Sequence, residues 1–250
     1  MKEKIPPYVK YTNDSDHFSD YNSYQNKYRQ SIRDSDSIII NIIEELSEDD
    51  HSNKTLIDVG CSTGNLLLHL NNRFPNYQLH GADLVESSWE ENFSNPKFAG
   101  IKFQAIDITN GIPNDGPFDI ITANAIFFAF DENFFAQAVS NLARVLKPNG
   151  VLIAFDYFTP FNQELTITET TPAHPQGLTM HVRSFEKATK SLKDAGFSSA
   201  EYREFQITKD LSLKDNRQTS TYTILNNNST QMCFRGSLFQ PWHHLIARKA

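Results

Sequence analysis

The feature that most constrains the fold is the strand-turn-helix pattern of Leu56–Asn65. A short apolar run leads to Asp58, and the small-residue turn Gly60–Gly64 follows it before a leucine-rich, helix-like stretch. A buried parallel strand that turns sharply into a helix has this pattern, and doubly wound sheets bind ligands at such a turn. A dinucleotide fingerprint would need glycine at positions 62 and 65, where this chain has Ser62 and Asn65.

At this turn the chain resembles the class I S-adenosylmethionine-dependent methyltransferases, whose first motif is an acid, one further residue and Gly-x-Gly-x-Gly. The small residue Ser62 stands in place of the middle glycine. An acid before the turn also suits a positively charged ligand, and the ammonium and sulfonium groups of S-adenosylmethionine are both cationic. The resemblance implies S-adenosylmethionine as cofactor and S-adenosylhomocysteine as product. The binding residues that it implies at this turn are Asp58, Gly60, Cys61 and Gly64.

Two further acids lie at predicted strand ends. Residues 77–84 predict a second strand that ends in Asp83, and residues 101–108 predict a third that ends in Asp107. An acid at the end of the second strand accepts hydrogen bonds from a ribose diol, although Asp83 could instead cap a helix over residues 86–93. The resemblance implies that Asp107 accepts from the adenine amino group. The cofactor residues expected here are Asp83, Leu84, Asp107 and Ile108.

The next stretch predicts a fourth strand and a long helix. The fourth strand covers Phe118–Ala125, and Asn124 near its end is an expected cofactor contact. Phe134–Leu146 has apolar residues at helical intervals, and Asp131 precedes it as the expected N-cap.

The second strongest resemblance lies in Leu142–Leu152, which is similar to the late methyltransferase motif L-x-R-V-L-K-P-G-G-x-L. Val151–Phe155 predicts the fifth strand, Phe197–Ile207 the sixth and Trp242–Lys249 the seventh. The chain between the last two exceeds what the common sheet needs, and Ser220–Phe234 predicts an inserted hairpin.

These elements predict an α/β fold. It is a Rossmann-like, seven-stranded, mostly parallel sheet with helices on both faces, an N-terminal helical cap and an inserted β-hairpin before the last strand. The cap covers residues 1–54 and the methyltransferase domain residues 55–250. Acceptor-site insertions are expected at about 156–183 and 208–239.

The N-terminal region predicts two helices. Ser37–Leu46 has a buried isoleucine face, and an earlier stretch has an aromatic stripe. Packing against the sheet explains the stripe most simply. The resemblance adds that a tyrosine hydroxyl of such a cap can reach the methionine carboxylate; Tyr24 is our candidate, with Tyr21 and Tyr28 as alternatives. The stripe consists of Phe18, Tyr21, Tyr24, Tyr28 and Ile32.

Methyl transfer needs alignment above all, and it needs a base only where the acceptor loses a proton. The segment after the fifth strand leaves the ligand-binding edge of the sheet, passes a turn-rich loop and enters a helix capped by Ser184. Our catalytic candidates are His174, His181 and Asp156, with His243 and His244 as further histidines. Aromatic side chains expected to line the site or to belong to the core are Phe127, Phe128, Phe130 and Tyr157.

Charge and composition limit the classes of acceptor and partner that we expect. The 250 residues carry 23 Lys and Arg against 30 Asp and Glu, a formal net charge of −7. Nucleic-acid binders usually present a basic face, so we expect no nucleic-acid partner.

No apolar run approaches the length of about 18 residues that spans a membrane, and the N-terminus has no apolar signal core. Two cysteines build neither a disulfide framework nor a zinc site. We therefore expect a cytoplasmic protein with no metal and no membrane partner; the oligomeric state is not predicted.

The leading functional hypothesis is a methyltransferase that acts on a small molecule, such as a hydroxyl of a sugar or secondary metabolite. A second hypothesis keeps the cofactor but places the methyl group on a protein or a larger biosynthetic intermediate. The third hypothesis is a nicotinamide oxidoreductase or a nucleotide-binding domain. It requires a third glycine near position 65, which this chain lacks.

Overall fold

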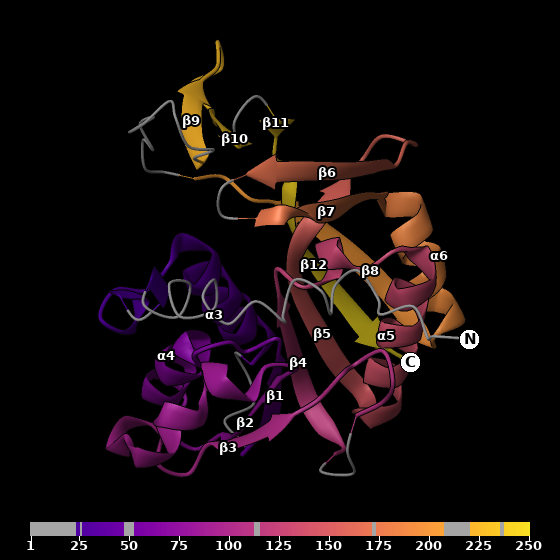
Figure 1. The fold of residues 1–250 in the computed structure, drawn as a ribbon. Helices are drawn as coiled ribbons and strands as arrows, with labels where there is room; N and C mark the ends of the chain where they lie inside the picture. Colours follow the sequence, from indigo (N-terminus) through magenta and orange to yellow (C-terminus); the bar gives the residue numbers. More distant parts are fainter. Residues whose placement is uncertain are drawn as a thin grey trace, which may run out of the picture.

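The computed structural model describes residues 24–25, 27–47, 53–112, 116–171, 174–207, 221–235 and 238–250. Its main sheet follows the strand order β3-β2-β1-β4-β5-β12-β8 (Figure 1). The strands from β3 to β5 run parallel, and β12 runs antiparallel to both of its neighbours. Two strands after β5 branch from it and bring the sheet to nine, and the predicted mostly parallel path of seven strands is confirmed. Its strands are β1 (Thr55–Val59), β2 (Gln78–Asp83), β3 (Lys102–Ala105), β4 (Phe118–Asn124), β5 (Leu146–Thr159), β8 (Phe197–Glu204) and β12 (Trp242–Lys249).

Alternation along the strands divides the core into two layers. Leu56 and Ile120 point to the face covered by α3 (Asp34–Leu46) and α4 (Asn65–Arg73). Their neighbours Ile57 and Ile121 point to the opposite face, covered by α5 (Glu132–Val145) and α6 (Phe185–Asp194). These four side chains are buried, and burying a large apolar side chain stabilises the folded state by about 1.5–3 kcal/mol. This burial holds the ligand-binding edge of the sheet in place.

Both predicted N-caps are confirmed. Asp131 accepts a hydrogen bond from the Phe134 backbone N–H at 2.9 Å, and Ser184 accepts one from that of Lys187 at 3.3 Å. These side chains satisfy amide groups that a helix start leaves without a partner. They fix where α5 and α6 begin after the ligand-binding edge of the sheet.

The segment after β5 differs from the prediction. The turn-rich loop is instead a β-hairpin of β6 (Leu165–Thr171) and β7 (His174–Ser184), which joins the end of β5. Its strands are rich in β-branched residues, and the hydroxyls of Thr168 and Thr179 bond across it at 3.0 Å.

Two other elements are shorter than predicted. The expected helix over residues 86–93 is a pair of 3-10 turns, η2 (Glu86–Ser88) and η3 (Glu90–Ser94). The third strand ends at Ala105, because Asp107 bonds to the backbone and side chain of Thr109 and starts a turn.

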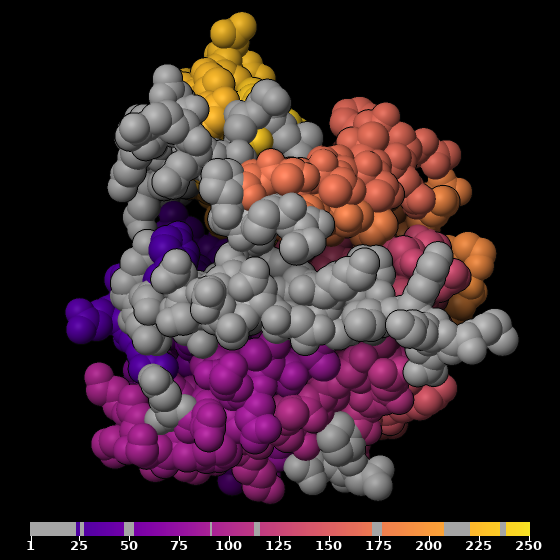
Figure 2. All heavy atoms as spheres, viewed as in Figure 1, coloured from indigo at the N-terminus to yellow at the C-terminus, as the bar shows by residue number. Residues whose placement is uncertain are grey.

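The inserted hairpin is confirmed and extends to three strands, β9 (Thr221–Leu225), β10 (Gln231–Arg235) and β11 (Leu238–Phe239). Figure 2 shows this small sheet standing over β6 and β7 at one end of the molecule. Arg235 of β10 and Glu169 of β6 form an ion pair at 2.7 Å that joins the two units. Within the described residues, no helix is long and apolar enough to cross a membrane.

Candidate functional site

The predicted site is built on the turn between β1 and α4. Gly60, Ser62 and Gly64 all have positive φ, at 71°, 49° and 76°. The backbone N–H groups of Gly60 and Cys61 both donate to the Ala82 carbonyl, at 2.7 and 3.0 Å. The turn is therefore tied to the end of β2. The Cys61 side chain is buried, and burial raises the pKa of its thiol well above the usual range.

Gly60 has a structural reason of its own for lacking a side chain. A Cβ atom there would lie 2.2 Å from Cγ2 of Ile126, which follows β4. The sequence led us to expect the methionine part of the ligand against this backbone; in the structure, Ile126 is the close neighbour. Gly64 is similarly crowded, because its Cβ would lie 2.9 Å from the Phe98 ring and 3.3 Å from that of Phe103.

Asp58 provides a buried acid directly below the turn. Its side chain is only 2% exposed, and the Thr122 hydroxyl donates to it at 2.7 Å. The pKa of Asp58 is raised to about 8: burial raises it most, the hydrogen bond from Thr122 lowers it, and the carboxylates of Asp36 and Asp83 add to the rise. A cation bound beside Asp58 would lower this pKa, and a phosphate would raise it further.

Asp83 joins the end of β2 to the turn. Its carboxylate accepts from the Ser62 N–H at 2.8 Å and from the Val85 N–H at 2.9 Å. Burial raises the pKa of Asp83, and these backbone bonds partly offset the effect. Two acceptor positions are used, and a carboxylate offers about four, so further bonds to hydroxyl groups fit.

The third predicted station lies after β3. Asp107 accepts from the Thr109 backbone and hydroxyl and from Asn110. Ile108 is buried, and Leu84 packs in the same apolar cluster. Asn141 of α5, which the sequence did not single out, donates to the Ile108 and Thr109 carbonyls at 2.9 and 3.0 Å. Nothing in the sequence around Asn141 indicated that its side chain bonds to the turn after β3.

The candidates from the N-terminal region do not share one environment. Tyr24 is 52% exposed and its hydroxyl lies 3.1 Å from that of Tyr28, while Phe18 and Tyr21 lie outside the described residues. Asn124 donates through Nδ2 to Asp36 of α3 at 2.7 Å. Asp36 was missed because it lies just before the isoleucine pattern that predicted the helix.

Asp156 supports the backbone beside the site. Its side chain is 1% exposed, and its oxygens accept from the N–H groups of Phe127 and Tyr157 at 2.7 and 2.8 Å. Burial raises the pKa of Asp156 to about 6, although nearby Arg183 lowers it. Arg183 in turn donates to the carbonyls of Phe127, Phe130 and Asp131. This geometry favours the orienting role of Asp156 over that of a base.

The histidines occupy different surroundings. His181 is half-buried on β7, with Nδ1 3.2 Å from the Thr166 hydroxyl, and burial lowers its pKa. The backbone of His174 starts β7, and its side chain lies outside what is described. His243 and His244 are buried on β12, and burial lowers the pKa of His244 to about 4. His181 and His174 stay predictions as bases.

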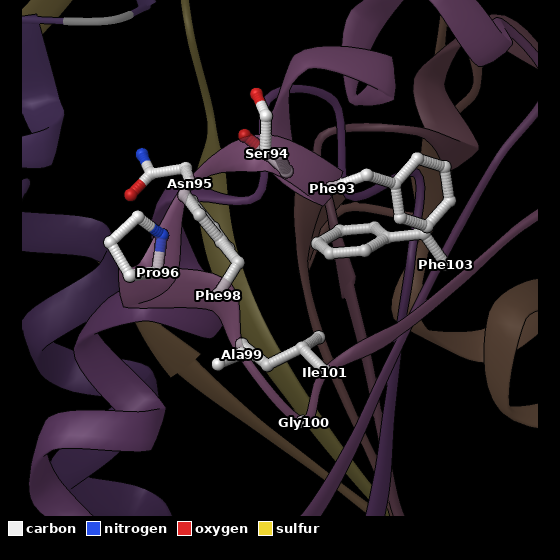
Figure 3. A pocket seen from close by; sticks show the side chains of 10 residues that line it. Phe93, Ser94, Asn95, Pro96, Phe98, Ala99, Gly100, Ile101 and Phe103 are labelled. Atoms are coloured by element: carbon white, nitrogen blue, oxygen red, sulfur yellow. The ribbon is translucent and has the colours of Figure 1, made fainter.

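A pocket of about 280 Å³ lies behind the turn, and its aromatic rings approach one another in Figure 3. Asn92 from its wall donates to the Thr63 carbonyl at 3.0 Å, so the wall supports the turn. The pocket contains no titratable side chain and none of the predicted site residues. Its lining consists of Asn92, Phe93, Ser94, Asn95, Pro96, Phe98, Ala99, Gly100, Ile101 and Phe103.

Comparison with known sequences gives a consistent result. Residues 56–150 match a family model described as a methyltransferase domain. Over 170 residues the chain is 28% identical to a malonyl-[acyl-carrier protein] O-methyltransferase of Paenibacillus sp., covering 63% of this chain and 60% of that protein. Over 99 residues it is 35% identical to a trans-aconitate 2-methyltransferase of Acidovorax sp., covering 39% and 36%. The chain spans about half the length of the curated relatives that it matches first.

Solved structures share the fold at low identity. The chain superposes on the magnesium protoporphyrin IX methyltransferase of Synechocystis with a TM-score of 0.60 and 12% identity, covering 100% of both chains. It superposes on an amino pentose methyltransferase of Micromonospora echinaspora with a TM-score of 0.58 and 15% identity, covering 91% and 97%.

The buried acid predicts a specific pH dependence of stability. Because the pKa of Asp58 rises from 3.8 to about 8 on folding, the native state keeps a proton that the unfolded chain loses between about pH 4 and 8. Stability from this group therefore falls as pH rises through that window, with a limiting slope of about 1.4 kcal/mol per pH unit. In urea unfolding without ligand, Asp58→Asn should gain stability relative to wild type as pH rises from 5 to 8.

Asp119 is the matched control. It lies at the opposite end of the sheet, where hydrogen bonds from Lys147 and Thr55 outweigh desolvation and lower its pKa. Its stabilising effect is present above about pH 4 and lost in more acid solution. Asp119→Asn should thus lose stability at neutral pH and show no gain above it. A stability difference between Asp58→Asn and wild type that stays constant with pH would contradict the assignment.

The close packing at Gly60 gives a second prediction. Gly60→Ala combines a positive φ with the contact to Ile126, and should destabilise the protein by about 2 kcal/mol or more. Adding Ile126→Ala should recover part of that loss, as a double-mutant cycle in thermal unfolding would measure. Gly100→Ala measures the cost of a positive φ alone, since Gly100 has a φ of 87° and a Cβ there would meet nothing within 4 Å. Strictly additive effects at Gly60 and Ile126 would rule out the contact.

Proposed function

The chain belongs to the class I S-adenosylmethionine-dependent methyltransferases, and on that premise we propose that it methylates a small-molecule acceptor. The observation that carries the proposal is a pair of acids at the turn, of which Asp58 is buried and Asp83 half-buried. Asp58 and Asp83 both have raised pKa values and lie beside a backbone of positive φ. Such a site suits a cation with a ribose, which is the chemistry of this cofactor. A hydroxyl of a sugar or secondary metabolite is the acceptor that we propose.

The cofactor supplies, when bound, a methyl group on a positively charged sulfur. Asp83 would accept from the ribose hydroxyls, and Asp58 would stabilise the positive charge through the turn. Asp107 would hold the adenine amino group, with Leu84 and Ile108 at the ring. Asp156 and Arg183 would hold the 3-10 turn η5 (Phe127–Ala129) in position, since Asp156 accepts from the N–H group of its first residue, Phe127, and Arg183 donates to the carbonyl of the same residue.

We place the acceptor beside a group of aromatic side chains at the end of β5. The Tyr157 ring lies 4.1 Å from that of Trp242 and 5.9 Å from that of Phe128. The Tyr157 hydroxyl accepts from Gln240 at 2.6 Å, and burial raises the Tyr157 pKa, so the group stays a neutral phenol. These side chains pack with Leu178, Met180 and Val182 of β7. The β6–β7 hairpin and the β9–β11 sheet would form the acceptor walls.

An acceptor attached to a carrier protein is the second candidate. It is favoured by apolar side chains that the small sheet exposes: Ile224 is 49% exposed, Leu225 59% and Phe239 44%. Exposed apolar groups of this kind often mark protein contacts. Parallel assays with a free acid and with its carrier-bound thioester would separate the two candidates, since only the second predicts a strong preference for the carrier.

The cofactor assignment is tested through Asp83. Asp83→Asn and Asp83→Ala should each weaken S-adenosylmethionine binding by about 1.5–3 kcal/mol, the range for hydrogen bonds to a charged group. Isothermal calorimetry provides the affinity, and circular dichroism verifies the fold. Glu86→Gln is the matched control, because this nearby acid is exposed. If wild type bound no S-adenosylmethionine and released no S-adenosylhomocysteine with any acceptor in a metabolite panel, the proposed function would be wrong.

The acceptor walls are tested through the ion pair between Glu169 and Arg235. Their side chains are only 16% and 24% exposed, so Glu169→Gln should loosen the small sheet from β6. We expect KM for the acceptor to rise several-fold while cofactor affinity stays the same. Glu164→Gln is the control, because its bond to Lys187 lies on a more exposed part of the hairpin. Equal kinetics in both variants would place the acceptor elsewhere.

A further inference from the structure

The side chain of Asp36 is a buried acid that the family motifs do not include. It lies in the first turn of α3 and is 1% exposed. Both donors that bond to it among the described residues, Asn124 at 2.7 Å and Ser35 at 3.4 Å, reach the same oxygen, Oδ1. A carboxylate removed from water needs more compensation than two neutral donors give.

The positively charged groups around Asp36 do not balance it. Arg33 and His69 lower its pKa, yet burial outweighs them and the pKa stays raised. The Arg33 guanidinium stacks on the Tyr28 ring at 4.3 Å, and His69 Nε2 lies 2.9 Å from the Tyr28 carbonyl. His244 fixes the helix start through the Ser35 carbonyl at 3.3 Å, but its low pKa keeps it neutral.

The sheet brings Asp36 to the predicted cofactor turn. Asn124, which holds Asp36, is two residues before Ile126, which packs on Gly60. On the other side, Asp36 lies near enough to Asp58 to raise the pKa of that group. Asp36 and the turn therefore flank the same end of β4.

A second observation indicates a polar ligand at this position. The hydroxyl oxygens of Ser62 and Thr63 in the turn are buried without a hydrogen-bond partner, and Thr63 is 2% exposed. Buried polar groups in proteins are normally paired, so the unpaired hydroxyls of the turn, whose Ser62 N–H bonds to Asp83, indicate that a ligand completes them.

We propose that Asp36 is a cofactor-binding residue, which α3 brings to the turn to recognise the positive charge of the cofactor's methionine part. The inference rests on the proposed function and adds a residue from outside the common sheet. A cation at this position would compensate Asp36 and Asp58 together. Binding should then depend on the charge at Asp36 and on the charge of the ligand.

Three adenosine ligands of different charge test this dependence. S-adenosylmethionine has a sulfonium and an ammonium group, S-adenosylhomocysteine only the ammonium, and methylthioadenosine neither. Asp36→Asn keeps the size and an acceptor for Asn124 but removes the negative charge. We expect it to weaken S-adenosylmethionine binding about tenfold or more and to leave methylthioadenosine binding unchanged, by calorimetry.

The pattern over the ligands separates the outcomes. Weaker binding of S-adenosylmethionine alone would place the sulfonium near Asp36, and weaker binding of S-adenosylhomocysteine as well would place the ammonium there. Equal loss for methylthioadenosine, or no loss for any ligand, would overturn the proposal. Asp34→Asn removes the same charge from the same helical turn and should weaken none of the ligands. Failure of the proposed function is distinct, since wild type would then not bind S-adenosylmethionine.

Discussion

The hydrogen bond from Thr122 to the buried carboxyl of Asp58 lies at the centre of the molecule. It joins the two central strands at the level where the cofactor turn begins, inside a sheet covered by helices on both faces. A single hydroxyl does not compensate a buried negative charge, and the pKa of about 8 expresses that deficit. A cation bound beside Asp58 would stabilise its ionised form, and we therefore propose that the surrounding turn binds a positively charged ligand.

Parallel strands explain how acids distant in the sequence meet at this site. Asp58 is the second-last residue of β1 and pairs with Gly81, and Asp83 is the last residue of the neighbouring parallel strand β2, so both acids lie near the same edge of the sheet. The turn at Gly60 is bonded to the last residues of β2, and Asp83 bonds back to Ser62. A shift of the turn would break its hydrogen bonds to Ala82 and Asp83 of β2. The ligand position consequently depends on the packing of the sheet more than on the loop itself.

Much of the sheet and of the cofactor turn could be predicted, because strand ends, caps and the small-residue turn are local signals. Asp131 and Ser184 are examples, since each cap lies three residues from the amide that it accepts. Contacts between distant segments gave no such signal. The bond between Asn124 and Asp36 joins residues 88 positions apart. The β6–β7 hairpin was taken for a loop, because its turn residues were visible while the pairing of its threonine-rich strands was not.

The two halves of the site have different structural origins. The acids that we propose for the cofactor lie on β1, β2 and the helix α3, which pack in the core. The aromatic group near Tyr157 is held instead by Gln240 and by strands added after β5. Its position depends on contacts between the hairpin and the small sheet, such as the ion pair of Glu169 and Arg235. Changes in those added strands can alter the acceptor walls while the bonds that hold the cofactor turn stay in place.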